Sequence, residues 1–158
     1  MEPEDPHRFT FDLDRGIREQ VIERLKDSPA ISFEKNLGPR ESGLYALYYD
    51  GELAYIGKAT KEFTESGRTL RARLNEHLSK LARRAIDLSR VTCRYLVFDS
   101  DWWVVAAEVA LIRHLNPPWN GSGLGSKTPG SGRPGTERVS KFDRLFPMRA
   151  EPDDNPGD

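Results

Sequence analysis

Cysteine is almost absent from this sequence. Cys93 is the single cysteine among 158 residues, so no intrachain disulfide can form and no zinc site can be built from cysteines. Long apolar runs are also missing, since stretches such as Trp102–Ala107 reach six residues, whereas a membrane span needs about 18. The acidic start of the chain lacks the basic-then-apolar order of a signal peptide. These absences predict a cytoplasmic globular protein.

The charge distribution is uneven although the net charge is only −1. Residues 1–34 carry five basic and nine acidic side chains, whereas residues 66–94 carry eight basic and two acidic ones, a net charge of +6. Residues 121–149 carry six basic and two acidic side chains. Local positive fields attract polyanions. A basic helix face can also be merely solvated, so charge alone leaves nucleic-acid binding open.

Hydrophobic periodicity predicts three main helices and three strands. Helices are expected over residues 13–27, 69–84 and 102–115, and strands over 43–49, 52–57 and 91–98, with Asp50-Gly51 as the turn of a hairpin. The last helix is apolar nearly all round, which predicts the most buried element of the fold. The order indicates an α+β domain with a three-stranded, mostly antiparallel sheet flanked by helices.

Composition divides the chain into four parts. We expect an N-terminal helical arm over 1–36, a core over 37–120, a basic glycine-rich extension over 121–149 and a disordered acidic tail over 150–158. The Gly-rich segment ending in Lys127-Thr128 superficially resembles a phosphate-binding loop, but Ser126 stands where the pattern needs glycine. Nucleotide binding is therefore not expected.

Three features could carry chemistry. Glu108 lies in an otherwise apolar stretch, so its carboxylate must reach an edge, pair with a cation or bind a metal. Arg73 and His77 are four residues apart and share a helix face, where one could clamp a phosphate and the other pass a proton. Tyr45 and Tyr55 stand in glycine-bordered triplets on adjoining strands. Each feature alone also has an ordinary structural explanation as an ion pair, a solvated helix face or a core aromatic.

Taken together, these residues resemble the GIY-YIG nuclease family. Gly43-Leu44-Tyr45 and Tyr55-Ile56-Gly57 match the two motifs that name it, with leucine in place of the middle isoleucine of the first. An arginine on the next helix (Arg73), a glutamate on a later helix (Glu108) and an asparagine after a proline-containing helix stop (Asn120) follow in the family's order. His77 and the basic extension most resemble the compact type II restriction endonucleases of that family.

The resemblance implies a GIY-YIG-type fold and hydrolysis of phosphodiester bonds with one divalent metal ion per site. It implies that Glu108 holds Mg²⁺, for which Mn²⁺ can substitute, that Arg73 holds the scissile phosphate, and that Tyr55 and Asn120 orient and brace the site. Tyr45 would be the general base or would position the water. Because an unperturbed phenol has a pKa of about 10, His77 would accept its proton or Lys58 would lower its pKa.

The implied partner is double-stranded DNA. Phosphate contacts are expected from basic residues of the helix region, namely Arg68, Arg71, Lys80, Arg83 and Arg84. Base contacts are expected from the extension, namely Lys127, Arg133, Arg138 and Lys141. Because arginine and lysine favour guanine in the major groove, a site containing G·C pairs is expected. A palindromic site cut on both strands favours a homodimer, with residues 13–27 as the candidate contact.

Two other functions remain open at this point. The chain could be a different GIY-YIG nuclease, structure-specific or carried by a mobile element, or a DNA-binding protein without catalysis. The joint presence of every expected site residue favours an active enzyme. The recognition sequence, the cut position and the overhang do not follow from the sequence.

Overall fold

The computed structural model describes residues 7, 12–62, 67–124 and 140–150. Within these ranges the chain forms helices, strands and one 3-10 turn in an order close to the predicted one. They are α1 (Leu13–Asp27), β1 (Ile31–Ser32), β2 (Gly43–Tyr49), β3 (Glu52–Ala59), α2 (Leu70–Ala82), η1 (Leu88–Arg90), β4 (Val91–Val97), α3 (Asp101–Leu115) and α4 (Lys141–Leu145). The described part of the N-terminal segment, including α1 and β1, packs into the same unit as the rest.

The sheet is antiparallel, with strand order β1-β4-β2-β3. The α+β class is confirmed, but the predicted count of three strands is wrong. The fourth strand, β1, lies in the expected connector and pairs Ile31 with Cys93 and Ser32 with Thr92. Two residues are too few to produce a period-two pattern, so no periodic signal marks this strand. In the described residues, β3 has one strand neighbour only and forms an edge of the sheet.

The hairpin of β2 and β3 forms as expected. Asp50 and Gly51 both have positive φ, 52° and 80°, the conformation that a tight two-residue turn with the right twist requires. The register places Tyr45 opposite Gly57 and Leu47 opposite Tyr55. Successive side chains of a strand point to opposite faces, so this register decides which motif residues share a face.

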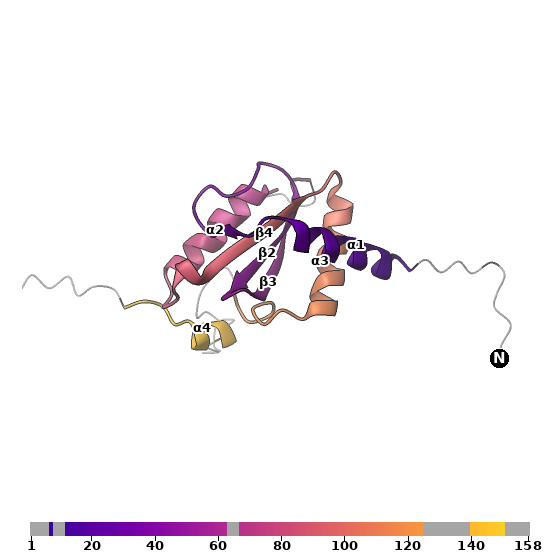
Figure 1. Cartoon of the computed structure of the whole chain (residues 1–158). Coiled ribbons are helices and arrows are strands. Elements are labelled where there is room, and N and C mark those ends of the chain that lie inside the picture. Colours follow the sequence, from indigo (N-terminus) through magenta and orange to yellow (C-terminus); the bar gives the residue numbers. More distant parts are fainter. Residues whose placement is uncertain (1–6, 8–11, 63–66, 125–139, 151–158) are drawn as a thin grey trace, which may run out of the picture.

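Helices cover both faces of the sheet (Figure 1), with α1 and α3 on one side and α2 on the other. Tyr45 and Leu47 belong to the apolar cluster beneath α2, while Leu44 and Ala46 pack against α1 and α3. Strand β2, which is fully buried from Leu44 to Leu47, lies between the two clusters. The central strand is therefore a continuous apolar run because both of its faces are covered.

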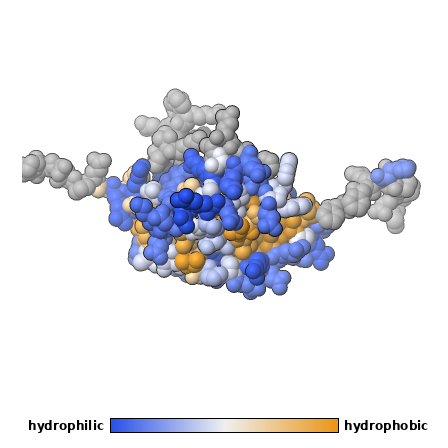
Figure 2. Space-filling model, turned by 90° about the horizontal axis from the view of Figure 1, so that it is seen from above, coloured by the Kyte–Doolittle hydropathy of each residue, from blue (hydrophilic) through white to orange (hydrophobic). Residues whose placement is uncertain are grey.

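Helix α3 departs from the prediction that it would be the most buried element. Val104, Ala107 and Leu111 are fully buried, but Trp102 is 72% exposed and Trp103 is 52% exposed. Trp119, which follows this helix, is buried. Figure 2, viewed from above, shows a mostly hydrophilic surface whose larger apolar area lies toward the side that carries α1 and α3.

The residues around α4 fasten the C-terminal part of the chain to the core. Phe142 is fully buried against Trp119 and Phe146. Arg84 is 3% exposed, pairs with Asp143, donates to the Phe146 carbonyl at 3.0 Å and lies over the Phe142 ring. The expectation that Arg84 contacts DNA phosphates is therefore wrong, because its guanidinium is buried in this anchor.

None of the helices in the described ranges is long and apolar enough to cross a membrane. Of the tail expected over residues 150–158, residues 151–158 lie outside the described residues.

Candidate active site at the edge of the sheet

Three aromatic side chains meet under α2. The ring centroids of Tyr45 and Tyr55 are 6.1 Å apart, and His77 lies 5.6 Å from Tyr45 and 5.1 Å from Tyr55. Tyr45 and His77 are fully buried, and Tyr55 is 8% exposed. Within the described residues, neither the Tyr45 hydroxyl nor either His77 ring nitrogen has a hydrogen-bond partner. Buried polar atoms without partners are rare and need an explanation, and a reacting group that occupies the site only in the working enzyme would supply one.

The motif glycines have a steric reason. A Cβ on Gly57 would overlap the end of the Tyr45 ring and its hydroxyl, because the two residues face each other across the hairpin. A Cβ on Gly43 would collide with the backbone carbonyl of Leu96 on β4. Glycine is therefore required at both positions for close approach of neighbouring atoms. At Gly57, the atom approached is the phenol oxygen of Tyr45.

Replacing Gly57 with alanine is expected to displace the Tyr45 ring. Overpacking of this kind costs about 1–3 kcal/mol of unfolding free energy, and a misplaced reacting group costs about 10²-fold in rate. Gly16→Ala is the matched control, since a Cβ there meets nothing within 4 Å and alanine favours a helix by about 0.5–1 kcal/mol. Urea unfolding and cleavage rates check both variants. A Gly57→Ala protein with wild-type stability and rate would contradict this packing.

Asn120 braces the strand that carries the second motif. Its side-chain oxygen accepts from the Ile56 backbone N–H at 2.9 Å, and its amide nitrogen donates to the Ile56 carbonyl at 2.8 Å. Trp119 extends the contact, since its backbone N–H donates to the Ala54 carbonyl at 2.8 Å. Because β3 is an edge strand, these bonds replace the missing neighbour. They hold Ile56, which lies between Tyr55 and Gly57.

Glu108 reaches the site from the opposite face of the sheet. It lies on α3, is 15% exposed and forms an ion pair with Lys58 of β3. Lys58 follows Gly57, so its side chain points away from the tyrosine face and toward α3. Of the three expected alternatives, an edge position, an ion pair or a metal, the structure shows the ion pair. Burial raises the pKa values of Tyr45 and Tyr55, and the negative charge of Glu108 adds to that rise.

Arg73 lies one turn before His77 on α2 and is 28% exposed. Its Nη1 donates to Glu76 at 2.9 Å. The positive charge of Arg73 offsets part of the rise that burial causes in the pKa values of the two tyrosines. Arg73 lies on the tyrosine face of the sheet, and Glu108 pairs with Lys58 on the other face.

Burial dominates the protonation states. It raises the pKa of Tyr45 well above the ordinary value, with a further contribution from Tyr55. Burial also lowers the pKa of His77 to about 3, helped by the charges of Arg73 and Lys80. Both groups are therefore neutral near pH 7. His77 does not carry the proton that an ordinary histidine would share at this pH.

Acid is expected to destabilise the protein through His77. Its folded-state pKa of about 3 lies below the unfolded value of 6.5, so the stabilising contribution is complete above pH 6.5 and is lost as the pH falls toward 3. Between pH 7 and pH 5 the loss is about 2 kcal/mol. Urea unfolding at both pH values should give a smaller drop for His77→Gln. An equal drop in both proteins would place the acid sensitivity elsewhere.

The other basic residues that were expected to contact DNA differ in their partners and in their exposure. Arg68 and Lys80 pair with Glu76, and Arg71 donates from Nε to the Gly38 carbonyl at 2.9 Å. Arg83 and Lys141 are exposed. The remaining three, Lys127, Arg133 and Arg138, lie outside the described residues. The flanks of that segment lie side by side, since the Phe142 backbone N–H donates to the Ser122 carbonyl at 2.8 Å.

Glu76 is a site residue that sequence reasoning missed. Its carboxylate contacts Arg68, Arg73 and Lys80. A signal was present, because Glu76 is the single acid between Arg68 and Arg84 and stands three residues after Arg73.

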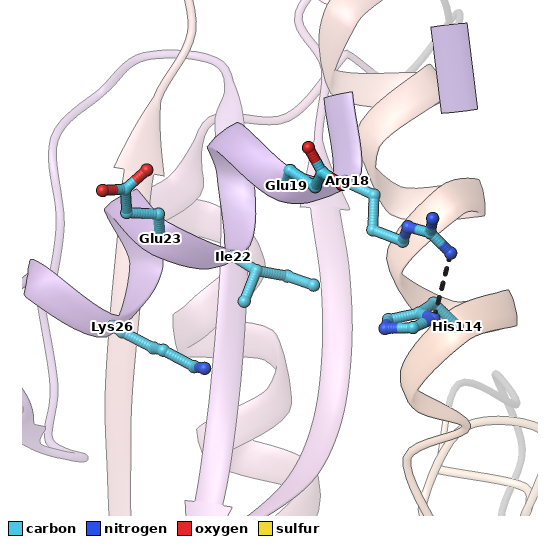
Figure 3. A pocket seen from close by; sticks show the side chains of 6 residues that line it. All are labelled: Arg18, Glu19, Ile22, Glu23, Lys26 and His114. Carbon is cyan, nitrogen blue, oxygen red and sulfur yellow. Dashed lines mark hydrogen bonds between the residues drawn. The ribbon is translucent and has the colours of Figure 1, made fainter. Parts of the chain in front are cut away.

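A surface hollow of about 440 Å³ lies between α1 and the end of α3 (Figure 3) and is unrelated to this site. It is lined by Arg18, Glu19, Ile22, Glu23, Lys26 and His114. Arg18 Nη1 and His114 Nδ1 are 3.1 Å apart there. His114 therefore contacts α1, as suits a residue at a helix end, and stands on the face opposite Tyr45.

The chain is similar to proteins that are already known. The solved structure of a mutant of bacteriophage T4 EndoII is similar over 65% of this chain and 98% of its own, with 17% identity and a TM-score of 0.37. No curated protein matches. The model of the Eco29kI GIY-YIG domain matches residues 54–156, about two thirds of the chain, from the second tyrosine motif through Arg73, Glu108 and Asn120. The chain belongs to the Eco29kI GIY-YIG domain family and is a nuclease of the GIY-YIG class.

Proposed function

We propose that this protein is a metal-dependent type II restriction endonuclease that cuts double-stranded DNA at a specific sequence. The observation that carries the proposal is the packing of Tyr45, Tyr55 and His77 against one another under α2. Arg73 stands one turn earlier on that helix, and Glu108 pairs with Lys58, the residue after Gly57 on β3. Membership of the Eco29kI domain family supports the restriction role.

The donor atoms fit a hard divalent ion. In the described residues there is no group of three or more His, Cys, Asp or Glu side chains that could hold a metal by themselves. The family resemblance implies one protein ligand, Glu108, whose carboxylate is partly exposed on α3 beside Lys58. Mg²⁺ suits such a place because it keeps several waters and is commonly bound through one or two carboxylates and substrate phosphates. We propose Mg²⁺ as the ion, with Mn²⁺ able to replace it and with Lys58 holding Glu108 when no ion is bound.

The residues divide the reaction among them. Arg73 holds the scissile phosphate and offsets its growing negative charge. Tyr45 positions the attacking water through its phenol oxygen, which takes the water's proton while its own proton passes to His77. In the described residues neither ring nitrogen of His77 is hydrogen-bonded to Tyr45, and burial lowers the pKa of His77 to about 3. The transfer therefore requires the bound phosphate to bring the two groups within hydrogen-bond distance and to stabilise the imidazolium. Glu108 would hold the divalent ion, which when bound would supply Lewis-acid stabilisation of the leaving 3′ oxygen.

Tyr55 and Asn120 act on geometry in this scheme. Tyr55 packs on His77 and Tyr45 and orients the water or the phosphate. Asn120 fixes the backbone of β3 through Ile56. Lys58 is engaged by Glu108, so its proposed influence on Tyr45 would need that ion pair to open.

DNA would be held by the basic surface around α2 and read by the extension. We propose that Arg68, Arg71, Lys80 and Arg83 position the duplex through phosphates. Lys127, Arg133, Arg138 and Lys141 would contact bases, preferably guanine. Support comes from the hydrogen bond between Phe142 and Ser122, which holds the flanks of this segment two residues from Asn120. We further propose that the recognition site is palindromic and contains G·C pairs, that the protein cuts as a homodimer, and that it is located in the cytoplasm.

A digest tests this function. Purified protein is incubated with plasmid DNA in Mg²⁺ or in EDTA, beside Arg73→Ala. Discrete fragments that require both Mg²⁺ and Arg73 are expected. A smear would keep the nuclease and remove the restriction role, and cleavage limited to branched or nicked DNA would favour a structure-specific enzyme. Retarded but uncut DNA would favour a binding protein.

A further inference from the structure

Glu76 is an unexpected residue on a surface that would bind phosphates. Residues 66–94 contain two acids, Glu76 and Asp87. Asp87 caps the turn η1 by accepting from the Ser89 backbone N–H at 3.0 Å. Glu76 instead lies among the basic side chains of α2, where its charge repels DNA. A carboxylate in this place weakens DNA binding, so its presence calls for a second role that outweighs this effect.

The contacts of Glu76 indicate that purpose. Its Oε2 accepts from Arg73 Nη1 at 2.9 Å and from Arg68 Nη1, and its Oε1 lies 3.3 Å from Lys80 Nζ. Burial alone would raise the pKa of Glu76, but Arg73, Lys80 and Arg68 together lower it below the ordinary value. The carboxylate is therefore ionised near pH 7, and three cations converge on it.

Of these three cations, Arg73 is the one that the proposed function places on the scissile phosphate. Arginine loses about 2 kcal/mol of rotamer entropy when its side chain is fixed, and Arg73 is 28% exposed at the edge of the site. Glu76 contacts its guanidinium through Nη1, whereas a guanidinium carries five N–H donors. Glu76 can thus fix the direction of the side chain without using the donors that a bidentate phosphate contact requires.

We propose that Glu76 is a positioning residue that holds Arg73 ready for the scissile phosphate at the expense of weaker DNA binding. The inference rests on the proposed function, in which Arg73 contacts that phosphate. It predicts opposite effects on two measurable steps. Loss of the carboxylate removes repulsion and tightens binding, while the unheld arginine slows the reaction of bound DNA.

The test measures both steps separately in full-length Glu76→Ala and Glu76→Gln proteins. Binding is measured with a short mixed-sequence duplex in EDTA, and cleavage with plasmid DNA under single-turnover conditions at saturating enzyme. Glu76→Ala is expected to bind about threefold more tightly and to cleave about 10- to 100-fold more slowly. Glu76→Gln should bind as tightly but cleave faster than Glu76→Ala, because the amide oxygen still accepts from Arg73.

Two controls separate the possible failures. Asp87→Asn removes an acid from the same basic stretch and should leave the cleavage rate unchanged. Arg73→Ala should abolish cleavage, and a cutting Arg73→Ala protein would overturn the role of Arg73 in the proposed function. If Arg73 is required, then wild-type cleavage by both Glu76 variants would overturn the role of Glu76 alone. Slower cleavage together with weaker binding would also overturn the role of Glu76, because it would indicate a general loss of structure in α2. Thermal melting of Glu76→Gln checks whether α2 is intact.

Discussion

Glu108→Gln is expected to reduce DNA cleavage by about 10³-fold or more while DNA binding is retained. The proposed ion has one carboxylate ligand from the described residues, so glutamine removes the charge that holds it. Loss of a group that stabilises transition-state charge commonly costs about 10²- to 10³-fold, and here both the ligand and its ion are lost. Binding should stay equal or become tighter, since Lys58 loses its carboxylate partner and adds positive charge.

The matched control is Glu52→Gln, an exposed glutamate at the start of β3, the strand that carries Lys58. It should cleave like the wild-type protein. Single-turnover rates over a range of Mg²⁺ concentrations check both variants. Substantial cleavage by Glu108→Gln in Mg²⁺ would place the metal on other residues.

Tyr45→Phe is expected to make the protein more stable and nearly inactive. The Tyr45 hydroxyl is buried without a hydrogen-bond partner among the described residues. Because burying an unpaired hydroxyl costs about 1–3 kcal/mol in proteins, its removal should raise the free energy of unfolding by about 1 kcal/mol. Loss of the group that positions the water and relays its proton should lower the cleavage rate by about 10²- to 10⁴-fold.

Tyr48→Phe provides the comparison on the other face of the sheet. Tyr48 is half-buried beneath the Arg94 guanidinium, which lies 5.8 Å from the ring centroid. The phenyl ring keeps that contact, and the change should leave cleavage intact. Urea unfolding and single-turnover cleavage are measured for both. A less stable Tyr45→Phe protein would mean that the hydroxyl has a partner, and full cleavage would remove it from the proton relay.

The local elements could be predicted because each carries its own signal. Asp50-Gly51 requires positive φ for a tight turn, and the helices show apolar positions at regular spacing. The short strand β1 could not be predicted, because its two residues form a strand only by pairing with β4, which is distant in sequence. The hydrophobic periodicity of a segment shows which of its side chains are buried, but it does not show which other segment they pack against.

The wrong expectations share one cause. An apolar helix was expected to be buried on all sides, but α3 covers one face of the sheet and leaves Trp102 and Trp103 exposed. A basic residue was expected to face DNA, but Arg84 is buried against Asp143 and Phe142. In both cases residue type suggested an environment that tertiary packing decides.

The candidate site was predictable as a set of residues but not as an arrangement. The motif order identified Tyr45, Arg73 and Glu108. The sequence did not reveal that Glu108 comes from the opposite face of the sheet, that Asn120 completes the free edge of β3, or that His77 is buried and neutral. These properties depend on strand order and burial, and they decide the protonation states on which the mechanism depends.

Sequencing the ends of DNA fragments tests the central claim most directly. Phage genomic DNA is digested with pure protein in Mg²⁺, and the positions of all new ends are mapped. The account predicts that ends recur at one short, palindromic, G·C-containing sequence, cut on both strands, and that Glu108→Gln produces none of them. Ends spread without sequence preference, or ends that appear equally with Glu108→Gln, would contradict it.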